Sequence, residues 1–376
     1  MKENSEKIIT PIPFINLKAQ QEKIRPELDI AIKRVLDHGK FIMGPEVLEL
    51  EERLADYCGA RYAVSCSSGT DALLMVLMAK KVGYGDAVFL PSFTYTATPE
   101  VVALLGATPI FLDVQKETFN INPDEISRGI NIAKEMDLNP KAIIAVDLFG
   151  LPADYDLLQK SAEEHNLWIL ADAAQSFGGS INDEKVGALA YATATSFFPA
   201  KPLGCYGDGG AIFTNDSELT EILKSIRVHG KGSSKYDNIR VGLNARLDTI
   251  QAAILLEKLK IFEDELQNRQ EIAATYNKAL SNIVKVPLVS EKRKSAWAQY
   301  TIQLTEHMDR TTIIDGLKEL GIPTMVYYEK PLHLQTAYKH FPTSGNLENS
   351  EILAQTVLSL PMSETLNPHS FSKMLF

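Results

Sequence analysis

A lysine in a constrained loop is the residue of this sequence best suited to covalent chemistry. Lys201 lies in the segment Ser196-Phe197-Phe198-Pro199-Ala200-Lys201-Pro202-Leu203-Gly204, and four glycines fall within residues 204–210. Such neighbours favour a partly desolvated amine, whose lowered pKa supplies the free base that imine formation needs. Most lysines are solvated surface charges, and the glycines could serve only as turns. Lys201 is therefore a candidate that needs support from other residues.

An acidic residue supplies part of that support. The segment Trp168-Ile169-Leu170-Ala171-Asp172-Ala173-Ala174-Gln175-Ser176 reads as an apolar strand that ends in a carboxylate. A carboxylate at the rim of a sheet needs a partner or water. A protonated pyridine nitrogen would be such a partner and would make the ring an electron sink. Gln175 could reach the ring or its hydroxyl, whereas in the alternative interpretation Asp172 only caps a helix.

Two further turns follow predicted strands. Ser67-Ser68-Gly69-Thr70-Asp71 opens a helix, where free backbone amides attract an anion such as phosphate. The same residue types also cap helices for purely structural reasons. Tyr95 follows the strand at residues 87–90 and could stack on a planar ring, although an aromatic residue there is more often packing. The four features together are more informative than each one alone.

Alternating patterns predict an α/β fold that would hold these residues. Short apolar runs occupy residues 63–66, 87–90, 108–113, 142–147, 168–172, 193–198 and 210–214. Helical patterns lie between them at residues 71–82, 98–105, 123–134 and 153–165. This alternation indicates a largely parallel sheet of about seven strands. Ligands of such sheets bind at the carboxyl ends of the strands, where the candidate residues fall.

The remaining segments predict a helical N-terminus and a smaller C-terminal domain. Residues 14–57 are helical in pattern, with a break at residues 39–45. Residues 247–276 read as one or two long helices. After them we expect a strand at 297–304, a helix at 310–320 and a strand at 321–328. We therefore expect a large domain at residues 1–260 and a small α+β domain at residues 261–376.

Composition excludes several classes of protein. The 376 residues are 45% hydrophobic and carry a net charge of −10, which argues against binding to nucleic acid or an anionic membrane. The sequence lacks a Gly-x-Gly-x-x-Gly dinucleotide motif, and its three cysteines have no metal-ligand spacing. Met1–Thr10 contains no apolar signal-peptide core, and no apolar run approaches the ~18 residues of a membrane span. We expect a cytoplasmic protein without a metal site.

These motifs resemble the DegT/DnrJ/EryC1/StrS sugar aminotransferases, which are pyridoxal-phosphate enzymes of fold type I. The resemblance extends from Phe14-Ile15-Asn16-Leu17 to Pro361-Met362. It is carried by four motifs: Gly44-Pro45-Glu46, Ser68-Gly69-Thr70-Asp71-Ala72-Leu73, Asp172-Ala173-Ala174-Gln175-Ser176 and Thr195-Ser196-Phe197-Phe198-Pro199-Ala200-Lys201.

The resemblance implies a role for each candidate. Lys201 would bind pyridoxal phosphate as an imine and shuttle a proton, and Asp172 would pair with the pyridine nitrogen. Tyr95 would stack on the ring, and Gln175 would lie beside its hydroxyl. The residues implied for the phosphate are Gly69, Thr70 and Ser196, with Asn244 reaching in from a second subunit of a homodimer.

The segments at 202–211 and 240–248 are most similar to the branch that aminates UDP-2-acetamido-3-keto sugars, notably the 3-keto-glucuronic acid, for bacterial surface polysaccharides such as lipopolysaccharide. The amino donor would be L-glutamate. Arg246 would lie in the substrate region, because its fork suits a carboxylate or diphosphate, although a salt bridge would also explain it. Another UDP- or dTDP-linked 3- or 4-keto sugar is the alternative substrate.

Two departures from the family concern the sugar and the C-terminus. The family often has His-Tyr-Pro near the sugar, whereas this chain has Tyr327 and Tyr328, followed by His333. We expect all three side chains to contact substrate, with Tyr327 in place of the usual histidine. The segment after Pro368 is short, so the usual final helix is expected to be clipped.

Three other functions compete with amino transfer. Family members that dehydrate sugars carry His where Lys201 stands, which favours transfer in this chain. A Schiff-base lyase without pyridoxal phosphate would need the lysine but neither Asp172 nor a phosphate turn. A regulatory protein on the same fold is opposed by the acidic charge balance.

Overall fold

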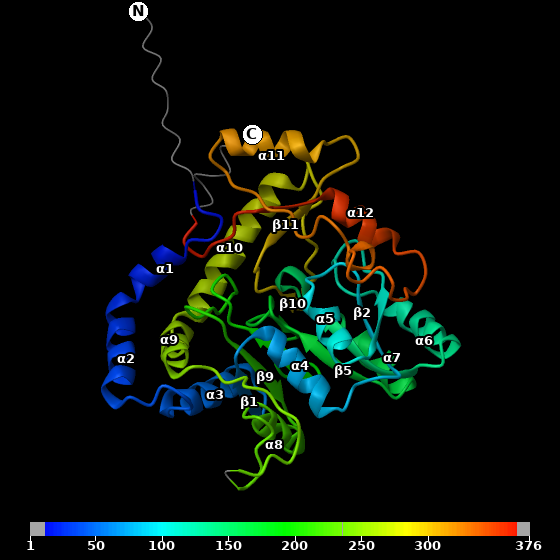
Figure 1. The fold of residues 1–376 in the computed structure, drawn as a ribbon. Coiled ribbons are helices and arrows are strands. Elements are labelled where there is room, and N and C mark those ends of the chain that lie inside the picture. Colours follow the sequence, from blue (N-terminus) through cyan, green and yellow to red (C-terminus); the bar gives the residue numbers. More distant parts are fainter. Residues whose placement is uncertain (1–11, 235, 367–376) are drawn as a thin grey trace, which may run out of the picture.

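The N-terminal part of the chain forms three helices, and the break predicted at residues 39–45 separates the second from the third. The computed structural model describes residues 12–234 and 236–366 (Figure 1). Its first helices are α1 (Leu17–Lys23), α2 (Arg25–His38) and α3 (Pro45–Cys58). Gly39 ends α2 with a φ of +67°, and Pro45 starts α3, where a missing N–H costs nothing. The predictions for Met1–Thr10 and for the segment after Pro368 lie outside the described residues.

A seven-stranded sheet forms the centre of the molecule and confirms the predicted α/β class. Its order is β1-β9-β8-β5-β4-β2-β3. Six of these strands are mutually parallel, and β9 alone runs antiparallel to its neighbours. The strands are β1 (Tyr62–Cys66), β2 (Asp86–Pro91), β3 (Thr108–Leu112), β4 (Asn139–Val146), β5 (Trp168–Asp172), β8 (Ala192–Ser196) and β9 (Gly210–Thr214).

Helices cover both faces of this sheet, which explains its continuous apolar runs. Adjacent residues of β4 point to opposite faces: Ile144 joins one core and Ile143 the other. The first core is covered by α4 (Gly69–Ala79), α5 (Ala97–Leu104) and α8 (Ser217–Ile226). The second is covered by α6 (Ile126–Glu135) and α7 (Tyr155–Glu164), and α6 follows the short helix η1 (Pro123–Glu125).

The predicted long helical stretch is two helices, α9 (Thr249–Leu259) and α10 (Phe262–Leu280), joined at a corner. The C-terminal elements are an antiparallel pair, β11 (Tyr300–Gln303) and β12 (Val357–Leu360), with α11 (Arg310–Glu319) and α12 (Glu348–Thr356). Smaller elements are β6 (Ser180–Ile181), β7 (Glu184–Lys185), β10 (Arg293–Lys294), η2 (Leu148–Gly150) and η3 (Leu332–Leu334). The domain division after residue 260 stays a prediction.

The strand predicted at residues 321–328 is wrong. Within it only Met325 pairs with a strand, as a single bridge to Ser359. Pro323 has no N–H to donate to a neighbouring strand, which breaks the ladder beside it. The segment instead runs on as a loop toward the carboxyl edge of the large sheet.

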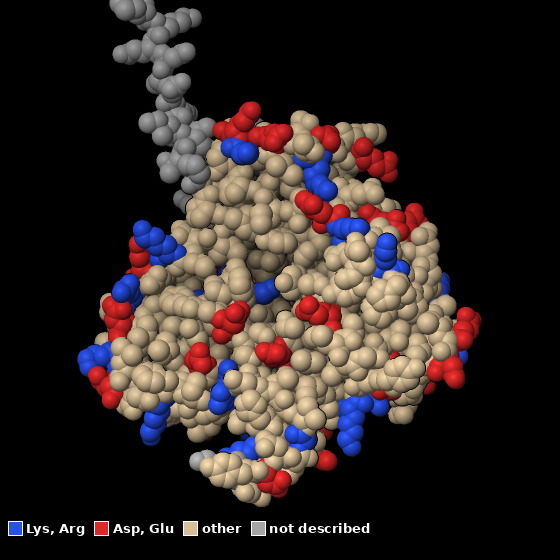
Figure 2. Space-filling model, viewed as in Figure 1, with Lys and Arg blue, Asp and Glu red and all other residues tan. Residues whose placement is uncertain are grey.

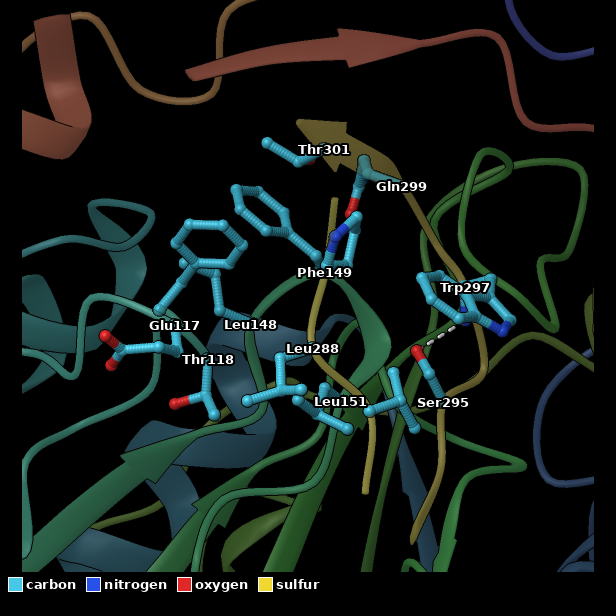
Figure 3. A pocket seen from close by; sticks show the side chains of 13 residues that line it. Glu117, Thr118, Leu148, Phe149, Leu151, Leu288, Ser295, Trp297, Gln299 and Thr301 are labelled. Atoms are coloured by element: carbon cyan, nitrogen blue, oxygen red, sulfur yellow. Dashed lines mark hydrogen bonds between the residues drawn. The ribbon is translucent and has the colours of Figure 1, made fainter. Parts of the chain in front are cut away.

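A small cavity lies behind η2 (Figure 3). Its volume is about 20 Å³, enough for a single water molecule. Phe149, Leu288, Trp297 and Gln299 are among its lining residues, and Gln299 Oε1 has no hydrogen-bond partner among the described residues. The predicted site residues do not line this cavity, which therefore belongs to the packing between η2 and the segment before β11.

A buried ion pair fixes the end of α8 against the sheet. Arg227 Nη1 pairs with Glu51 of α3 and donates to the carbonyl of Ser65 in β1 at 2.8 Å. Glu51 also accepts from the Ser65 N–H at 2.8 Å and from its hydroxyl at 2.7 Å. Removing one member of such a buried pair leaves the other charge uncompensated.

We therefore expect Glu51→Gln to lower the free energy of unfolding by about 3–5 kcal/mol, because Arg227 would stay buried without its anion. The matched control is Glu49→Gln on the same helix, which breaks an exposed pair with Arg53 and should cost roughly 0–1 kcal/mol. Urea unfolding followed by circular dichroism measures both. Equal losses in the two variants would contradict the structural role of the Glu51–Arg227 pair.

Candidate active site

The carboxyl ends of the parallel strands bring the predicted residues to one edge of the sheet. Cys66 ends β1, Asp172 ends β5 and Ser196 ends β8, and the register pairs Ser196 and Cys66 with the same residue of β9, Gly210. The face shown in Figure 2 is hollowed near its centre, and a basic side chain lies in the hollow. Parallel topology thus gathers turns that are far apart in the sequence.

Asp172 is a buried carboxylate whose hydrogen bonds do not include a cation. Its side chain accepts from Thr98 Oγ1 at 3.0 Å and from the Ala174 N–H at 3.3 Å. Burial raises its pKa, while the two hydrogen bonds and the nearby Lys201 amine act in the opposite direction. Among the described residues, no cation lies within ion-pair distance of this carboxylate, and the Lys201 amine is its nearby positive group.

Lys201 lies on a closed loop beyond β8. The Lys201 N–H donates to the Phe198 carbonyl at 2.8 Å, and the Cys205 N–H donates to the Phe197 carbonyl at 2.8 Å. Burial lowers the pKa of the Lys201 amine, and attraction to Asp172 opposes this shift. The structure thus places the predicted amine beside the predicted carboxylate, in surroundings that favour the free base.

The predicted phosphate turn forms the N-terminus of α4 and touches the end of β8. Ser68 caps α4 by accepting from the Asp71 N–H at 3.0 Å, so the first amides of the helix at Gly69 and Thr70 stay free of that cap. A Cβ on Gly69 would lie 2.7 Å from the Cβ of Ser196. Glycine therefore allows the N-terminus of α4 to approach the Ser196 side chain. The free amides of the helix and the Ser196 hydroxyl together could form a cradle for an anion, that is, a site whose donors surround it.

Aromatic side chains and an amide line the neighbouring part of the site. Gln175 Nε2 donates to the Tyr328 hydroxyl at 3.3 Å, and Gln175 Oε1 accepts from the Phe149 N–H at 2.6 Å. The rings of Tyr95 and Tyr328 lie 6.4 Å apart, and Tyr95 is 57% exposed. Tyr95 thus presents an open aromatic face, whereas Gln175 is fixed by two partners.

Tyr327 and His333 come from the C-terminal loop that crosses this edge. The Tyr327 and Tyr328 rings are 5.8 Å apart, and both tyrosines have raised pKa values because they are desolvated. His333 Nδ1 lies 2.6 Å from Ser92 Oγ, and its Nε2 lies 3.3 Å from Glu351. Both ring nitrogens of His333 therefore have partners within the chain, and its contact with substrate stays a prediction.

Asn244 and Arg246 lie on a different segment, between α8 and α9. Arg246 donates to Asn244 Oδ1 at 2.6 Å, and the backbone of Asn244 bridges Val228. Asn244 is exposed, and its contacts within one chain are with its own segment. Within the described residues, Asn244 makes no hydrogen bond to the turn at Gly69, so its predicted role requires a second subunit.

Two residues near the site were not identified from the sequence. Thr98 on α5 donates to Asp172, and Asp147 at the end of β4 accepts from Ser176, Tyr155 and the Ala153 N–H. Asp147 is buried, and desolvation raises its pKa to about 7. Its position directly after an apolar strand, like that of Asp172, was the available signal. Thr98 gave none, because its contact depends on how α5 packs.

Comparisons with known proteins agree with this geometry. The DegT/DnrJ/EryC1/StrS aminotransferase family matches residues 22–375. UDP-2-acetamido-2-deoxy-3-oxo-D-glucuronate aminotransferase of Pseudomonas aeruginosa is 46% identical over 360 residues, which cover 96% of this chain and 97% of that protein.

Solved structures give the same result. A DegT DnrJ EryC1 StrS aminotransferase from Brucella abortus superposes with a TM-score of 0.94 at 50% identity, covering 97% of each chain. NtdA from Bacillus subtilis, solved with bound cofactor PMP, has a TM-score of 0.88 at 29% identity, covering 100% of this chain and 85% of that one. The chain therefore belongs to the DegT/DnrJ/EryC1/StrS aminotransferase family.

Proposed function

We propose that this protein transfers an amino group from L-glutamate to a nucleotide-linked keto sugar, with pyridoxal phosphate as its cofactor. The observation that carries the proposal is the placement of the half-buried, desolvated Lys201 amine near Asp172, at the edge that also presents the N-terminus of α4. A Schiff-base lyase would need the amine alone. The anion cradle and the carboxylate without a cation favour the aminotransferase instead.

The residues present fit this cofactor. The approach of Gly69 to Ser196, which a Cβ would block, suits a phosphate group. The buried Asp172 carboxylate suits a protonated ring nitrogen, because such a cation would supply the missing positive partner. The exposed face of Tyr95 suits stacking, and the Gln175 amide lies on the side of Tyr328.

Pyridoxal phosphate, when bound, supplies an aldehyde that condenses with amines and a ring that accepts an electron pair. The chain's own part begins at Lys201 Nζ, whose lowered pKa makes the neutral amine available. The same nitrogen can then take and return a proton during transfer. Asp172 Oδ2, which accepts from Thr98 Oγ1, would hold a ring nitrogen in its protonated form by accepting its proton in a hydrogen bond.

For the acceptor we propose a UDP-2-acetamido-3-keto sugar, specifically the 3-keto-glucuronate, used in bacterial surface polysaccharide synthesis. The similarity to the Pseudomonas aeruginosa aminotransferase supports this choice. We propose that the sugar substrate is contacted by Tyr327, Tyr328 and Arg246, and also by His333. Another UDP- or dTDP-linked keto sugar remains the alternative acceptor.

We also propose a cytoplasmic homodimer in which Asn244 completes the partner's phosphate site. Exposed apolar side chains support an interface near this segment: Val241 is 83% exposed and Ile239 is 57% exposed. The strand-like contact of Ile42 with Asp248 brings a further exposed apolar residue to the same stretch. None of the helices within residues 12–366 is both long and apolar enough to span a bilayer.

The covalent role of Lys201 predicts a pH profile for cofactor uptake. Only the neutral amine reacts, so the rate at which visible absorbance develops after adding pyridoxal phosphate should rise with pH. Because burial lowers the pKa of Lys201, the rise should end below the value of about 10.4 for an ordinary lysine. Lys201→Ala should give no such absorbance, and Lys224→Ala, an exposed control on α8, should match the native protein.

A rate that still climbs near pH ~10.4 would contradict the lowered pKa. Absorbance that survives in Lys201→Ala would contradict the assignment of this lysine.

The proposed acceptor predicts a substrate preference. With glutamate as donor, the holoenzyme should form 2-oxoglutarate fastest with UDP-2-acetamido-3-keto-glucuronate, because the Arg246 fork suits the carboxylate. A matched panel of the UDP-3-keto sugar without the carboxylate, and of dTDP-linked 3- and 4-keto deoxyhexoses, provides the controls. Activity confined to dTDP sugars would replace the proposed acceptor with the alternative.

A further inference from the structure

A buried lysine behind the Lys201 loop has no part in the function described so far. Lys258 lies on α9 and is 1% exposed. Its ammonium donates to the Gly204 carbonyl at 2.5 Å and lies 5.2 Å from the centre of the Tyr206 ring. None of the ion pairs among the described residues includes Lys258. Among the described residues, the side-chain hydrogen bond of Lys258 is therefore to the backbone of the loop that carries Lys201.

An ammonium in this position is costly to bury, because no carboxylate is in direct contact with it. Desolvation lowers its pKa to about 8, although Glu265 and Glu364 attract it from a greater distance. With that pKa the amine is mainly protonated at neutral pH. The buried ammonium of Lys258 therefore has the Gly204 carbonyl oxygen as its hydrogen-bond acceptor among the described residues.

That carbonyl belongs to a loop with little freedom. A Cβ on Gly204 would lie 2.5 Å from the Pro199 carbonyl oxygen, so the two sides of the loop are in close contact. The hydrogen bond from the Cys205 N–H to the Phe197 carbonyl closes the loop at its base. If Gly204 moved, the Pro199 backbone that contacts it would have to move too, and Lys201 follows Pro199 by two residues.

The other side of Lys258 faces charged residues of α10 and the C-terminal segment. Glu265 is 2% exposed and accepts from Gln20 Nε2 at 2.8 Å. Arg269 pairs with Glu364 at 3.1 Å, and both side chains are buried. Lys258 thus lies between the Lys201 loop and a buried polar network that joins α1, α10 and residue 364.

We propose that Lys258 is a positioning residue for Lys201, whose bond to the Gly204 carbonyl holds the loop in the geometry that the reacting amine needs. The inference rests on the proposed covalent role of Lys201. A purely structural Lys258 would stabilise the fold without affecting how fast Lys201 reacts.

The test compares Lys258→Met, which keeps the unbranched stem but removes the donor and its charge, with Tyr276→Phe. Tyr276 is a matched control, since it is a buried residue of α10 that donates to the Pro361 carbonyl at 2.9 Å, away from the Lys201 loop. Three quantities are measured: the rate of covalent uptake of pyridoxal phosphate, kcat and KM of the holoenzyme, and amide hydrogen exchange of residues 197–205. Thermal melting reports the stability of each variant.

In Lys258→Met we expect the uptake rate and kcat to fall roughly tenfold to 100-fold, because small misplacements of a reacting group have effects of this size. KM for the sugar should stay within about twofold, and exchange at residues 197–205 should become faster. Tyr276→Phe should keep all of these at native values. Lys258→Gln, which retains an N–H donor, should recover part of the uptake rate, and Lys258→Leu, which also lacks a donor, replaces Lys258→Met if that variant does not fold.

Native uptake, kcat and exchange in a folded Lys258 variant without a donor would overturn the proposal, as would equal losses in Tyr276→Phe. Hydrogen exchange is measured without cofactor. It therefore reports whether Lys258 restrains residues 197–205 even if Lys201 does not bind pyridoxal phosphate. Failure of the proposed function would appear separately, as visible absorbance that persists in Lys201→Ala.

Discussion

The placement of a half-buried amine near a buried carboxylate is the constraint on which the site depends. Asp172 and Lys201 attract each other, yet burial pushes each toward its neutral form. Neither side chain is satisfied by a direct ion pair with the other among the described residues. Under the proposed function, a cationic ring nitrogen beside Asp172 and an aldehyde beside Lys201 would stabilise this arrangement.

The fold provides this placement through strand topology. Asp172 ends β5, and the Lys201 loop follows β8, which is the neighbour of β5 in the sheet. The adjacent helix N-terminus approaches Ser196 because Gly69 lacks a side chain. Thr98 reaches Asp172 from α5, so the carboxylate is oriented by a helix and the amine by a loop. Each group is thus held by a different element of one rigid sheet edge.

Much of this could be predicted from the sequence, for identifiable reasons. Apolar runs bounded by turns predicted the strands, and parallel strands place their carboxyl ends together, so Asp172, Ser196 and Lys201 were expected to be neighbours. Contacts that depend on packing could not be predicted in this way. The bond from Thr98 to Asp172 depends on the rotation of α5, and that of Lys258 to Gly204 on the packing of α9. Pro323 interrupted a strand that hydrophobicity alone had favoured.

The proposed function depends on Lys201 as the residue that binds pyridoxal phosphate covalently. The most direct measurement is reduction of the purified holoenzyme with borohydride, followed by proteolysis and mass spectrometry of the peptides. If Lys201 is the anchor, we expect one phosphopyridoxyl group per chain, on the peptide that contains Lys201. A modification confined to another lysine, such as Lys258, or the absence of any modified peptide from a coloured holoenzyme, would contradict it.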